Sequence, residues 1–354
     1  MVARKMNKSL DINDLPTLKE TMYTDRFIIP SGVDIVDHLI LGVGGLPTSR
    51  VVEIAGDEGS GKTTFCMNIA RNTIRNGGMV ILLDMEGDWT PDRLRMVGFT
   101  DEDFARIRVL HKQFWEEYFE ALYQLIENLR KKQQEDGLNI PITIVVDSVA
   151  FGLTKQQYDS MIASKHAPVA ALASFFSQRL PLLEYWLREL PVLLLLINQF
   201  RQQLNLTSPY MQAIQPIETT GGRAIKYAAS VRLTIKMLRK VDEKLSNDGI
   251  PIGYIARIEQ LKNKLNAPVF TGEYLQYFNG RVGNWYTYIQ EGVNYGIIEQ
   301  KGGWYAFKDH KFRRRADVEK EPWYPELKEA VQAKWKEEIE RIKQTQAEEG
   351  GTDE

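Results

Sequence analysis

Residues 50–75 read RVVEIAGDEGSGKTTFCMNIARNTIR, and this stretch determines the fold class. Its middle, Gly56 to Thr63, matches the phosphate-loop pattern G-x-x-x-x-G-K-[ST]. The apolar run Arg50–Ala55 predicts a buried strand before the loop, and a helical pattern over Thr63–Arg75 follows it. Because a phosphate loop needs a strand before it and a helix after it, this context favours a nucleoside triphosphate site over a glycine-rich turn without a ligand.

The loop residues supply the chemistry that a triphosphate needs. Glycines allow backbone N–H groups to turn inward around phosphate oxygens, and the helix N-terminus adds the positive end of its dipole. Lys62 would neutralise charge on the β- and γ-phosphates, and the Thr63 hydroxyl would bind Mg²⁺. We therefore expect the triphosphate to be bound and hydrolysed here. The predicted contacts are Gly56, Asp57, Glu58, Gly59, Ser60, Gly61, Lys62 and Thr63.

Further apolar runs indicate that the loop belongs to a large α/β domain. They alternate with segments long enough to be helices, such as Phe114–Arg130. Continuous apolar strands that alternate with helices predict a mostly parallel sheet covered on both faces. The further predicted strands are Met79–Leu83, Ile142–Val146 and Val192–Ile197.

Polar residues follow three of these strands, at the sheet edge where open parallel sheets bind ligands. Asp147 ends one strand and is the expected partner of the magnesium ion, although an aspartate in this place is often only a helix cap. Asp84-Met85-Glu86 ends another, and Glu86 is our candidate for the base that activates the attacking water. Gln199 ends the third, where a γ-phosphate sensor would lie.

The totals limit the class of protein. A chain of 354 residues with 43% hydrophobic residues is long enough for one large core with smaller appendages. The net charge of −2 neither suggests nor excludes nucleic acid, and the four histidines show no metal-ligand spacing. The single cysteine, Cys66, excludes a disulfide within the chain, and no apolar run is long enough to cross a bilayer. We therefore predict a cytoplasmic protein with no membrane partner.

Composition divides the chain into four predicted parts. Residues 1–28 form a polar N-terminal arm, and residues 29–275 hold the phosphate loop and the predicted sheet. Aromatic residues then crowd among glycines, which indicates a small α+β domain over residues 276–346. That domain closes with a helix over Pro325–Gln346, whose apolar residues recur every three or four positions. Residues 347–354 form an acidic tail.

A long segment without helical or strand period runs from Arg201 to Ile217. Residues 200–240 contain seven Lys and Arg against one acidic residue, in contrast to the slightly negative chain. Cationic groups beside isolated apolar side chains such as Leu204 suit single-stranded nucleic acid, because phosphates supply affinity and exposed bases accept apolar contacts. The alternative interpretation is a solvated basic face beside a structureless loop.

A pair of lysines follows further along the chain. Lys262 and Lys264 are two positions apart, so their side chains lie on one side if this segment is a strand. Such a pair is ordinarily surface decoration, and it gains meaning only if an anion lies opposite.

Several further motifs stand in a fixed order around those above. They are Pro30-Ser31-Gly32 with Asp34 to Asp37, Gly44-Gly45-Leu46-Pro47, Val145 to Ala150, Ile197-Asn198-Gln199, Thr219 to Gly222, Ala228 to Leu233, Ala267-Pro268 and Gly302-Gly303-Trp304-Tyr305. In this order and spacing the chain resembles the RecA recombinases from about Ile29 to Phe307.

The resemblance implies an ATP- and Mg²⁺-dependent recombinase that forms a helical filament on single-stranded DNA. Such a filament searches duplex DNA for homology and exchanges strands, and the N-terminal arm would serve oligomerisation. By position, Thr64 joins the phosphate contacts, Glu86 is the catalytic carboxylate and Asp147 is the magnesium partner. Gln199 would couple the γ-phosphate to the DNA loop that follows it.

Other positions take intersubunit and DNA roles by the same resemblance. Lys262 and Lys264 match a catalytic pair that reaches the ATP of the neighbouring subunit, and Tyr227 matches an aromatic position at that interface. The DNA loops would lie around Asp159–Pro168 and Arg201–Thr220. The implied DNA contacts are Arg201, Leu204, Arg223 and Lys226.

The chain departs from the family pattern in several places. Arg93 stands where bacterial members carry an aromatic residue over the adenine, so we expect guanidinium stacking there. The second DNA loop is longer than in bacterial members, and the N-terminal arm matches poorly. These departures are similar to a phage-encoded RecA-like recombinase. The basic stretch Lys308 to Arg315 would capture duplex DNA, while the nearby aromatic residues favour a domain core over a stacking surface.

A second function fits the same fold. The chain could be a ring motor such as a helicase, or a regulatory paralogue that does not recombine. An appended helicase-type domain would favour this alternative, and the sequence shows none.

Overall fold

The computed structural model describes residues 27–163, 171–200, 219–245, 249–265, 270–313 and 316–350. The strands are β1 (Ile28–Ile29), β2 (Leu46–Pro47), β3 (Arg50–Gly56), β4 (Met79–Asp84), β5 (Ile107–Val109), β6 (Ile142–Asp147), β7 (Val192–Gln199), β8 (Val231–Val241), β9 (Gly253–Asn263), β10 (Thr271–Tyr277), β11 (Val282–Gly283), β12 (Glu299–Lys301), β13 (Trp304–Phe307) and β14 (His310–Phe312). The helices are η2 (Val36–Ile40), α2 (Lys62–Arg75), α3 (Pro91–Val97), α4 (Asp101–Phe104), α5 (Trp115–Asp136), α6 (Lys155–Ile162), α7 (Ala171–Leu187), α9 (Arg223–Ala228), α10 (Asn284–Asn294), η3 (Ala316–Lys320) and α11 (Tyr324–Gly350).

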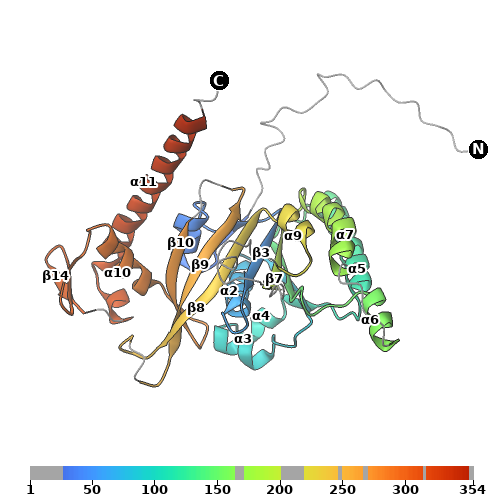
Figure 1. The fold of residues 1–354 in the computed structure, drawn as a ribbon, viewed down its shortest axis with the longest axis horizontal. Helices are drawn as coiled ribbons and strands as arrows, with labels where there is room; N and C mark the ends of the chain where they lie inside the picture. The colour runs from blue at the N-terminus through green and yellow to red at the C-terminus, as the bar shows by residue number, and fades with distance from the viewer. Residues whose placement is uncertain are drawn as a thin grey trace, which may run out of the picture.

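A nine-stranded sheet runs through the large domain in the order β11-β10-β9-β8-β3-β7-β6-β4-β5 (Figure 1). The strands from β8 to β5 are parallel, and β9, β10 and β11 continue the sheet antiparallel. Strand β3 lies between β7 and β8, which places the phosphate loop at the middle of the sheet edge. The four predicted strands are present, and each is one or two residues longer than predicted.

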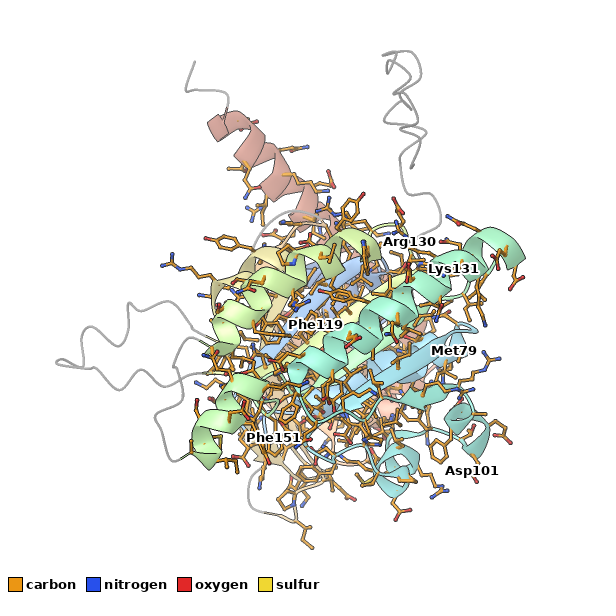
Figure 2. All side chains as sticks on the ribbon, turned by 90° about the vertical axis from the view of Figure 1, so that its right-hand side faces the viewer. Met79, Asp101, Phe119, Arg130, Lys131 and Phe151 are labelled. Atoms are coloured by element: carbon orange, nitrogen blue, oxygen red, sulfur yellow. The ribbon has the colours of Figure 1, made fainter. Side chains whose placement is uncertain are left out.

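Side chains of the parallel strands alternate between two apolar clusters, one on each face of the sheet. Val52 and Ile54 of β3 pack in the cluster that contains α2, whereas Val51 joins the cluster of α5 and α7. Figure 2 shows α5 and α7 side by side over one face, and Phe119 of α5 lies 5.1 Å from Phe175 of α7 between ring centroids. Both faces are covered, which explains why these strands read as continuous apolar runs. The predicted α/β class with a mostly parallel sheet is confirmed.

Helix α5 is longer than predicted. Phe114 is its N-cap, and the helix continues past Arg130 to Asp136. The polar run after Arg130 forms exposed turns that end only at Gly137, whose φ of 65° is left-handed and closes the helix. Across the described ranges, no helix combines the length and the apolar character that a membrane span requires.

The small domain combines α10, the three-stranded sheet β12-β13-β14 and α11. Its centre is aromatic, with Trp285, Tyr288 and Trp335 fully buried. The preference for a domain core over a stacking surface is therefore confirmed for these rings, although Trp304 is 51% exposed. The central sheet continues past residue 275 to β11, and α11 continues past residue 346 to Gly350. The domain boundaries themselves stay predictions.

A polar cluster joins the small domain to the segment before β2. The Asp34 carboxylate accepts hydrogen bonds from Tyr288 Oη at 2.7 Å and Asn284 Nδ2 at 3.0 Å, and it pairs with Lys328 Nζ at 3.0 Å. These three residues lie on α10 and α11, about 250 residues or more from Asp34 in the sequence. Asp34 of the Asp34 to Asp37 motif thus links the segment before β2 to α10 and α11.

Asp37 gives stability a dependence on pH. Burial raises its pKa from 3.8 to about 7, although Ser31 N and Gly32 N both donate to its carboxylate. Because the folded-state pKa is the higher one, the folded state binds this proton more tightly, and the stabilisation present below about pH 4 is lost as the pH rises to 7. We expect the melting temperature of the wild type to fall between pH 5 and pH 8 and that of Asp37→Asn to fall less. The difference between the two falls should be about 2 °C or more. Parallel curves for the two proteins would contradict this assignment.

Candidate nucleotide-binding site and adjoining surfaces

The phosphate loop connects the end of β3 to the first turn of α2. Gly56 is closely packed, because a Cβ at this position would lie 2.3 Å from the Ile235 carbonyl oxygen. Gly61 has a φ of 98°, a left-handed conformation that favours glycine, and it is the N-cap of α2. The sequence pattern therefore folds into strand, loop and helix as predicted.

The Lys62 ammonium group is enclosed by the loop. The residue is 7% exposed, and its Nζ donates to the Asp57 carbonyl oxygen at 2.6 Å. Burial lowers the pKa of Lys62, while the charges of Asp147 and Glu86 oppose that change. An anion within the loop would compensate this desolvated charge, as a phosphate-loop lysine does toward the β- and γ-phosphates.

Asp147, at the end of β6, lies beside the start of α2. Trp89 Nε1 donates to its Oδ2 at 2.9 Å. Burial raises the pKa of Asp147 to about 6, although the Thr63 hydroxyl lies close enough to the same carboxyl group to act in the opposite direction. Its Oδ1 is buried and has no hydrogen-bond partner among the described residues. A nearby cation would stabilise the ionised form of this carboxyl group.

Thr63 and Asp147 fit a magnesium ion that arrives with the nucleotide. In the described ranges no group of three or more His, Cys, Asp or Glu side chains could hold a metal by itself. Mg²⁺ is usually bound through one or two carboxylates together with substrate phosphates and water, so such a group is not required. The hydroxyl of Thr63 and the unpartnered Oδ1 of Asp147 supply oxygen atoms of the right kind.

The turn after β4 is held by Asp84 and presents Glu86. The Asp84 carboxylate accepts from the backbone N–H groups of Gly87 at 2.8 Å and Trp89 at 3.1 Å. Glu86 is exposed, and the Ser148 hydroxyl donates to its carboxylate. Strands β4 and β6 are neighbours, which brings this carboxylate to the residue next to Asp147. Asp84 thus holds the turn and leaves the Glu86 carboxylate exposed beside Ser148. The catalytic role of Glu86 stays a prediction.

Tyr254 lies beside the phosphate loop, and Arg93 is close enough to Tyr254 to affect its pKa. Arg93 Nη1 pairs with Asp88 Oδ2 at 2.8 Å. A Cβ added to Gly61 would lie 2.1 Å from the Tyr254 hydroxyl oxygen, so this tyrosine is in direct contact with the loop. Burial raises the pKa of Tyr254 to about 12, and the positive charge of Arg93 acts in the opposite direction. Stacking of Arg93 on adenine stays a prediction.

Gln199 lies directly beside the loop. It ends β7 and pairs with Gly56 in the register between β3 and β7. Its carbonyl oxygen accepts from Thr220 N at 3.4 Å, and Phe200 forms an isolated bridge with Thr219. The start and the end of the predicted second DNA loop therefore meet next to the phosphate loop.

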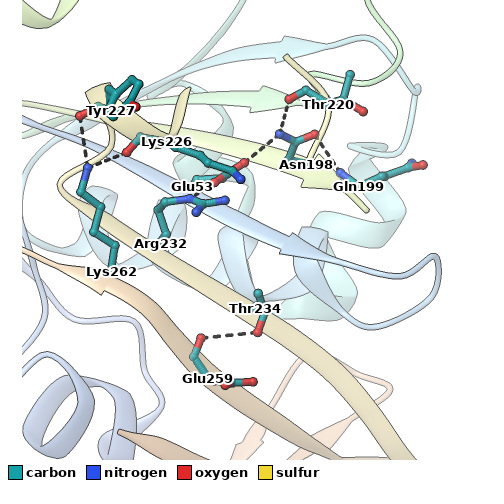
Figure 3. Close-up of polar contacts among 10 residues, drawn as sticks. All are labelled: Glu53, Asn198, Gln199, Thr220, Lys226, Tyr227, Arg232, Thr234, Glu259 and Lys262. Carbon is teal, nitrogen blue, oxygen red and sulfur yellow. Dashed lines mark hydrogen bonds and ion pairs between the residues drawn. The ribbon is translucent and has the colours of Figure 1, made fainter. Parts of the chain in front are cut away.

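The two predicted intersubunit lysines lie in different environments. Lys262 Nζ donates to the carbonyl oxygens of Lys226 at 2.5 Å and Tyr227 at 3.2 Å, so it caps the C-terminal end of α9 (Figure 3). Lys264 follows the end of β9 and is exposed. Tyr227 is 72% exposed, and its place at a subunit interface stays a prediction. Burial lowers the pKa of Lys262, and the nearby positive charges of Lys264 and Arg232 lower it further.

Comparison with known proteins decides the family. A family model described as the RecA N-terminal domain matches residues 3–281. This chain belongs to the RecA family.

Relatives from several bacteria are similar over most of the chain. Protein RecA of Laribacter hongkongensis (strain HLHK9) is 29% identical over 353 residues, which cover 99% of this chain and 90% of the relative. Protein RecA of Frankia alni (strain DSM 45986 / CECT 9034 / ACN14a) is 30% identical over 279 residues, or 79% of this chain and 73% of the relative. Protein RecA of Salinispora tropica is 29% identical over 304 residues, which cover 86% of this chain and 80% of the relative. A phage-encoded origin stays a prediction.

Some predicted positions of this RecA-family chain lie outside the described residues. They include Arg201 and Leu204, residues 1–26 of the arm, the end of the first DNA loop after Ala163, and the tail after Gly350. Arg223 and Lys226 lie on α9, where Arg223 is exposed and Lys226 is half-buried. Their contacts with DNA stay predictions.

Two residues of the RecA-family site, Trp89 and Tyr254, were not predicted from the sequence, and Ser148 was expected only as part of the motif Val145 to Ala150. Trp89 and Ser148 contact the two acidic residues of the site, and both are close in sequence to residues that were predicted. Both carry a hydrogen-bond donor, and in the sequence Trp89 is three positions after Glu86 and Ser148 directly follows Asp147. A donor this close to a predicted acidic residue is a signal that could have identified them. Tyr254 belongs to β9, far from the loop in the chain, and only the sheet order brings it to Gly61.

Proposed function

We propose that this chain is an ATP-dependent DNA recombinase that forms helical filaments on single-stranded DNA and carries out homologous pairing and strand exchange. Family membership supports a DNA-dependent ATPase that uses Mg²⁺. The observation that carries the proposal is the pairing of Gln199 with Gly56, because it joins the start of the second DNA loop to the phosphate site. Location in the cytoplasm and capture of duplex DNA by the small domain are parts of the same proposal.

In the proposed reaction, the chain positions the triphosphate and stabilises charge. Lys62 balances negative charge on the β- and γ-phosphates, which grows on the leaving group as the terminal bond breaks. Glu86 orients the attacking water and accepts its proton, and the Ser148 hydroxyl fixes the carboxylate that does so. Bound Mg²⁺ would supply further charge neutralisation at the phosphates. Gln199 contacts the γ-phosphate and changes position when that group is lost.

ATP hydrolysis measured with and without single-stranded DNA tests the proposed function. We expect DNA to increase turnover, and we expect electron microscopy to show filaments when ATP, Mg²⁺ and DNA are all present. Pairing of a labelled strand with homologous duplex should then exceed unwinding of a forked duplex. Absence of both filaments and DNA stimulation would overturn the proposal, and unwinding without pairing would favour the ring motor.

Lys264→Ala is expected to impair hydrolysis mainly in the assembled state. Lys264 is exposed and would reach the nucleotide of a neighbouring subunit, where the loss of one positive charge should lower DNA-stimulated turnover about tenfold or more. Turnover without DNA should stay within about twofold of the wild type. Lys262→Ala is the comparison, because it also removes the cap of α9 and should lower the melting temperature as well. Equal losses with and without DNA in Lys264→Ala would contradict the in-trans role.

A further inference from the structure

A buried polar cluster connects three strands of the central sheet next to the phosphate loop. Glu53 on β3 and Asn198 on β7 are 0% exposed, and Arg232 on β8 is 7% exposed. Figure 3 shows the three side chains together with the backbone of Thr220. Glu53 lies three residues before Gly56 on the same strand, so the cluster and the phosphate loop share one rigid element.

Asn198 is the centre of this cluster. Its Nδ2 donates to Glu53 Oε1 at 2.8 Å and to the Thr220 carbonyl oxygen at 2.8 Å. Its Oδ1 accepts from the backbone N–H of Gln199 at 2.9 Å. Both amide hydrogens and the amide oxygen of this one side chain are therefore in use. Asn198 joins the sheet to both ends of the segment from Phe200 to Thr219.

Glu53 requires its partners. Arg232 Nε donates to Glu53 Oε2, while Asn198 Nδ2 serves the other oxygen. A buried carboxylate is strongly destabilised when a partner is removed, because its charge is then neither hydrated nor paired. Asn198 is consequently held in one place by a charge that is itself fixed to β8. A hydrogen bond to a charged group of this kind is stronger than one between neutral groups.

We propose that Asn198, held by the Glu53–Arg232 ion pair, is a positioning residue that makes DNA affinity depend on the bound nucleotide. This inference rests on the proposed function, because it assigns the γ-phosphate sensor to Gln199 and DNA binding to the segment after it. A movement of Gln199 toward or away from a γ-phosphate acts directly on Asn198, through their shared backbone and the Gln199 N–H bond. The bond from Asn198 to the Thr220 carbonyl oxygen transfers that movement to the far end of the DNA loop and to α9.

The arrangement differs from ordinary core packing in one respect. Core packing alone would be served by apolar side chains at these positions, which would avoid the desolvation of a charged pair. Here the polar groups are directed at the two ends of one segment and at the strand that carries the phosphate loop. The Asn198 side chain thus connects Gln199, at the start of the loop, with Thr220, at its end.

The test compares the affinity for fluorescein-labelled oligothymidylate in the presence of a non-hydrolysable ATP analogue with that in the presence of ADP. Asn198→Leu keeps the size of the side chain and removes all three hydrogen bonds, and Asn198→Ser keeps a hydroxyl that can serve only one of the two acceptors. The quantity compared is the dissociation constant for DNA with ADP divided by that with the ATP analogue. We expect this ratio to fall at least about tenfold in Asn198→Leu and less in Asn198→Ser. The melting temperature of each variant shows whether it is folded. If Asn198→Leu does not fold, the comparison of Asn198→Ser with the wild type is the test.

Thr234→Val is the matched control. Thr234 is a buried polar residue of β8, and its hydroxyl bonds the Glu259 carbonyl oxygen at 3.5 Å, away from the cluster (Figure 3). This variant should keep the wild-type ratio. A wild-type ratio in a folded Asn198 variant, or an equal loss in Thr234→Val, would overturn the inference. A ratio near one in the wild type itself would instead contradict the proposed function.

Discussion

Replacing Lys62 by alanine is expected to lower ATP turnover at least about a hundredfold. The ammonium group is buried within the phosphate loop, and its pKa is lowered by that burial, so the loop holds a positive charge that water stabilises poorly. A triphosphate supplies the missing counter-charge, and the interaction strengthens as negative charge develops on the leaving phosphate. Alanine removes this charge and leaves the phosphates with the other groups of the loop and the magnesium ion.

Steady-state hydrolysis with saturating ATP, together with binding of a fluorescent nucleotide, measures this effect. Lys131→Ala is a suitable control, because Lys131 is an exposed lysine on α5 (Figure 2). The control should keep wild-type turnover, and both variants should melt within about 2–4 °C of the wild type, which corresponds to about 1 kcal/mol. Turnover of Lys62→Ala within tenfold of the wild type would show that the lysine has no catalytic role.

Four neighbouring parallel strands of the central sheet, β3, β7, β6 and β4, could be predicted because they are apolar on both faces. Val51 and Val52 of β3 enter opposite clusters, and β4, β6 and β7 have the same property. Such runs are distinct in a sequence, and their polar ends therefore stand out as well. Asp147, Glu86 and Gln199 were placed correctly at the sheet edge for this reason.

Strand order and its consequences could not be predicted in this way. The cluster of Glu53, Asn198 and Arg232 joins residues that are 145 and 179 positions apart, and a sequence does not state which strands are neighbours. Each of these residues alone looks like a polar interruption of an apolar strand. The spacing of Lys262 and Lys264 predicted that their side chains lie on one side of a strand. The hydrogen bonds of Lys262 to α9, however, depend on how β9 pairs with β8. Residues whose partners are distant in the chain need the fold before their role is visible.

Replacing Glu86 by glutamine is expected to separate catalysis from binding. Glutamine has the same size and can still accept from the Ser148 hydroxyl, so the turn and the nucleotide pocket should be preserved. It cannot accept a proton from water at neutral pH, and the loss of a general base typically costs about a hundredfold to ten-thousandfold in turnover. Nucleotide affinity and melting temperature should therefore stay near the wild-type values while hydrolysis is lost.

Asp84→Asn distinguishes this role from a structural one. Asp84 accepts hydrogen bonds from backbone N–H groups of Gly87, Asp88 and Trp89, so its carboxylate shapes the turn that presents Glu86. The asparagine variant should lose stability and nucleotide affinity together, because an amide cannot accept all of these bonds at both of its ends. If Glu86 acts only through the shape of the turn, Glu86→Gln would keep more than a tenth of wild-type turnover. If it takes the proton of the attacking water, only Glu86→Gln combines full nucleotide binding with lost hydrolysis.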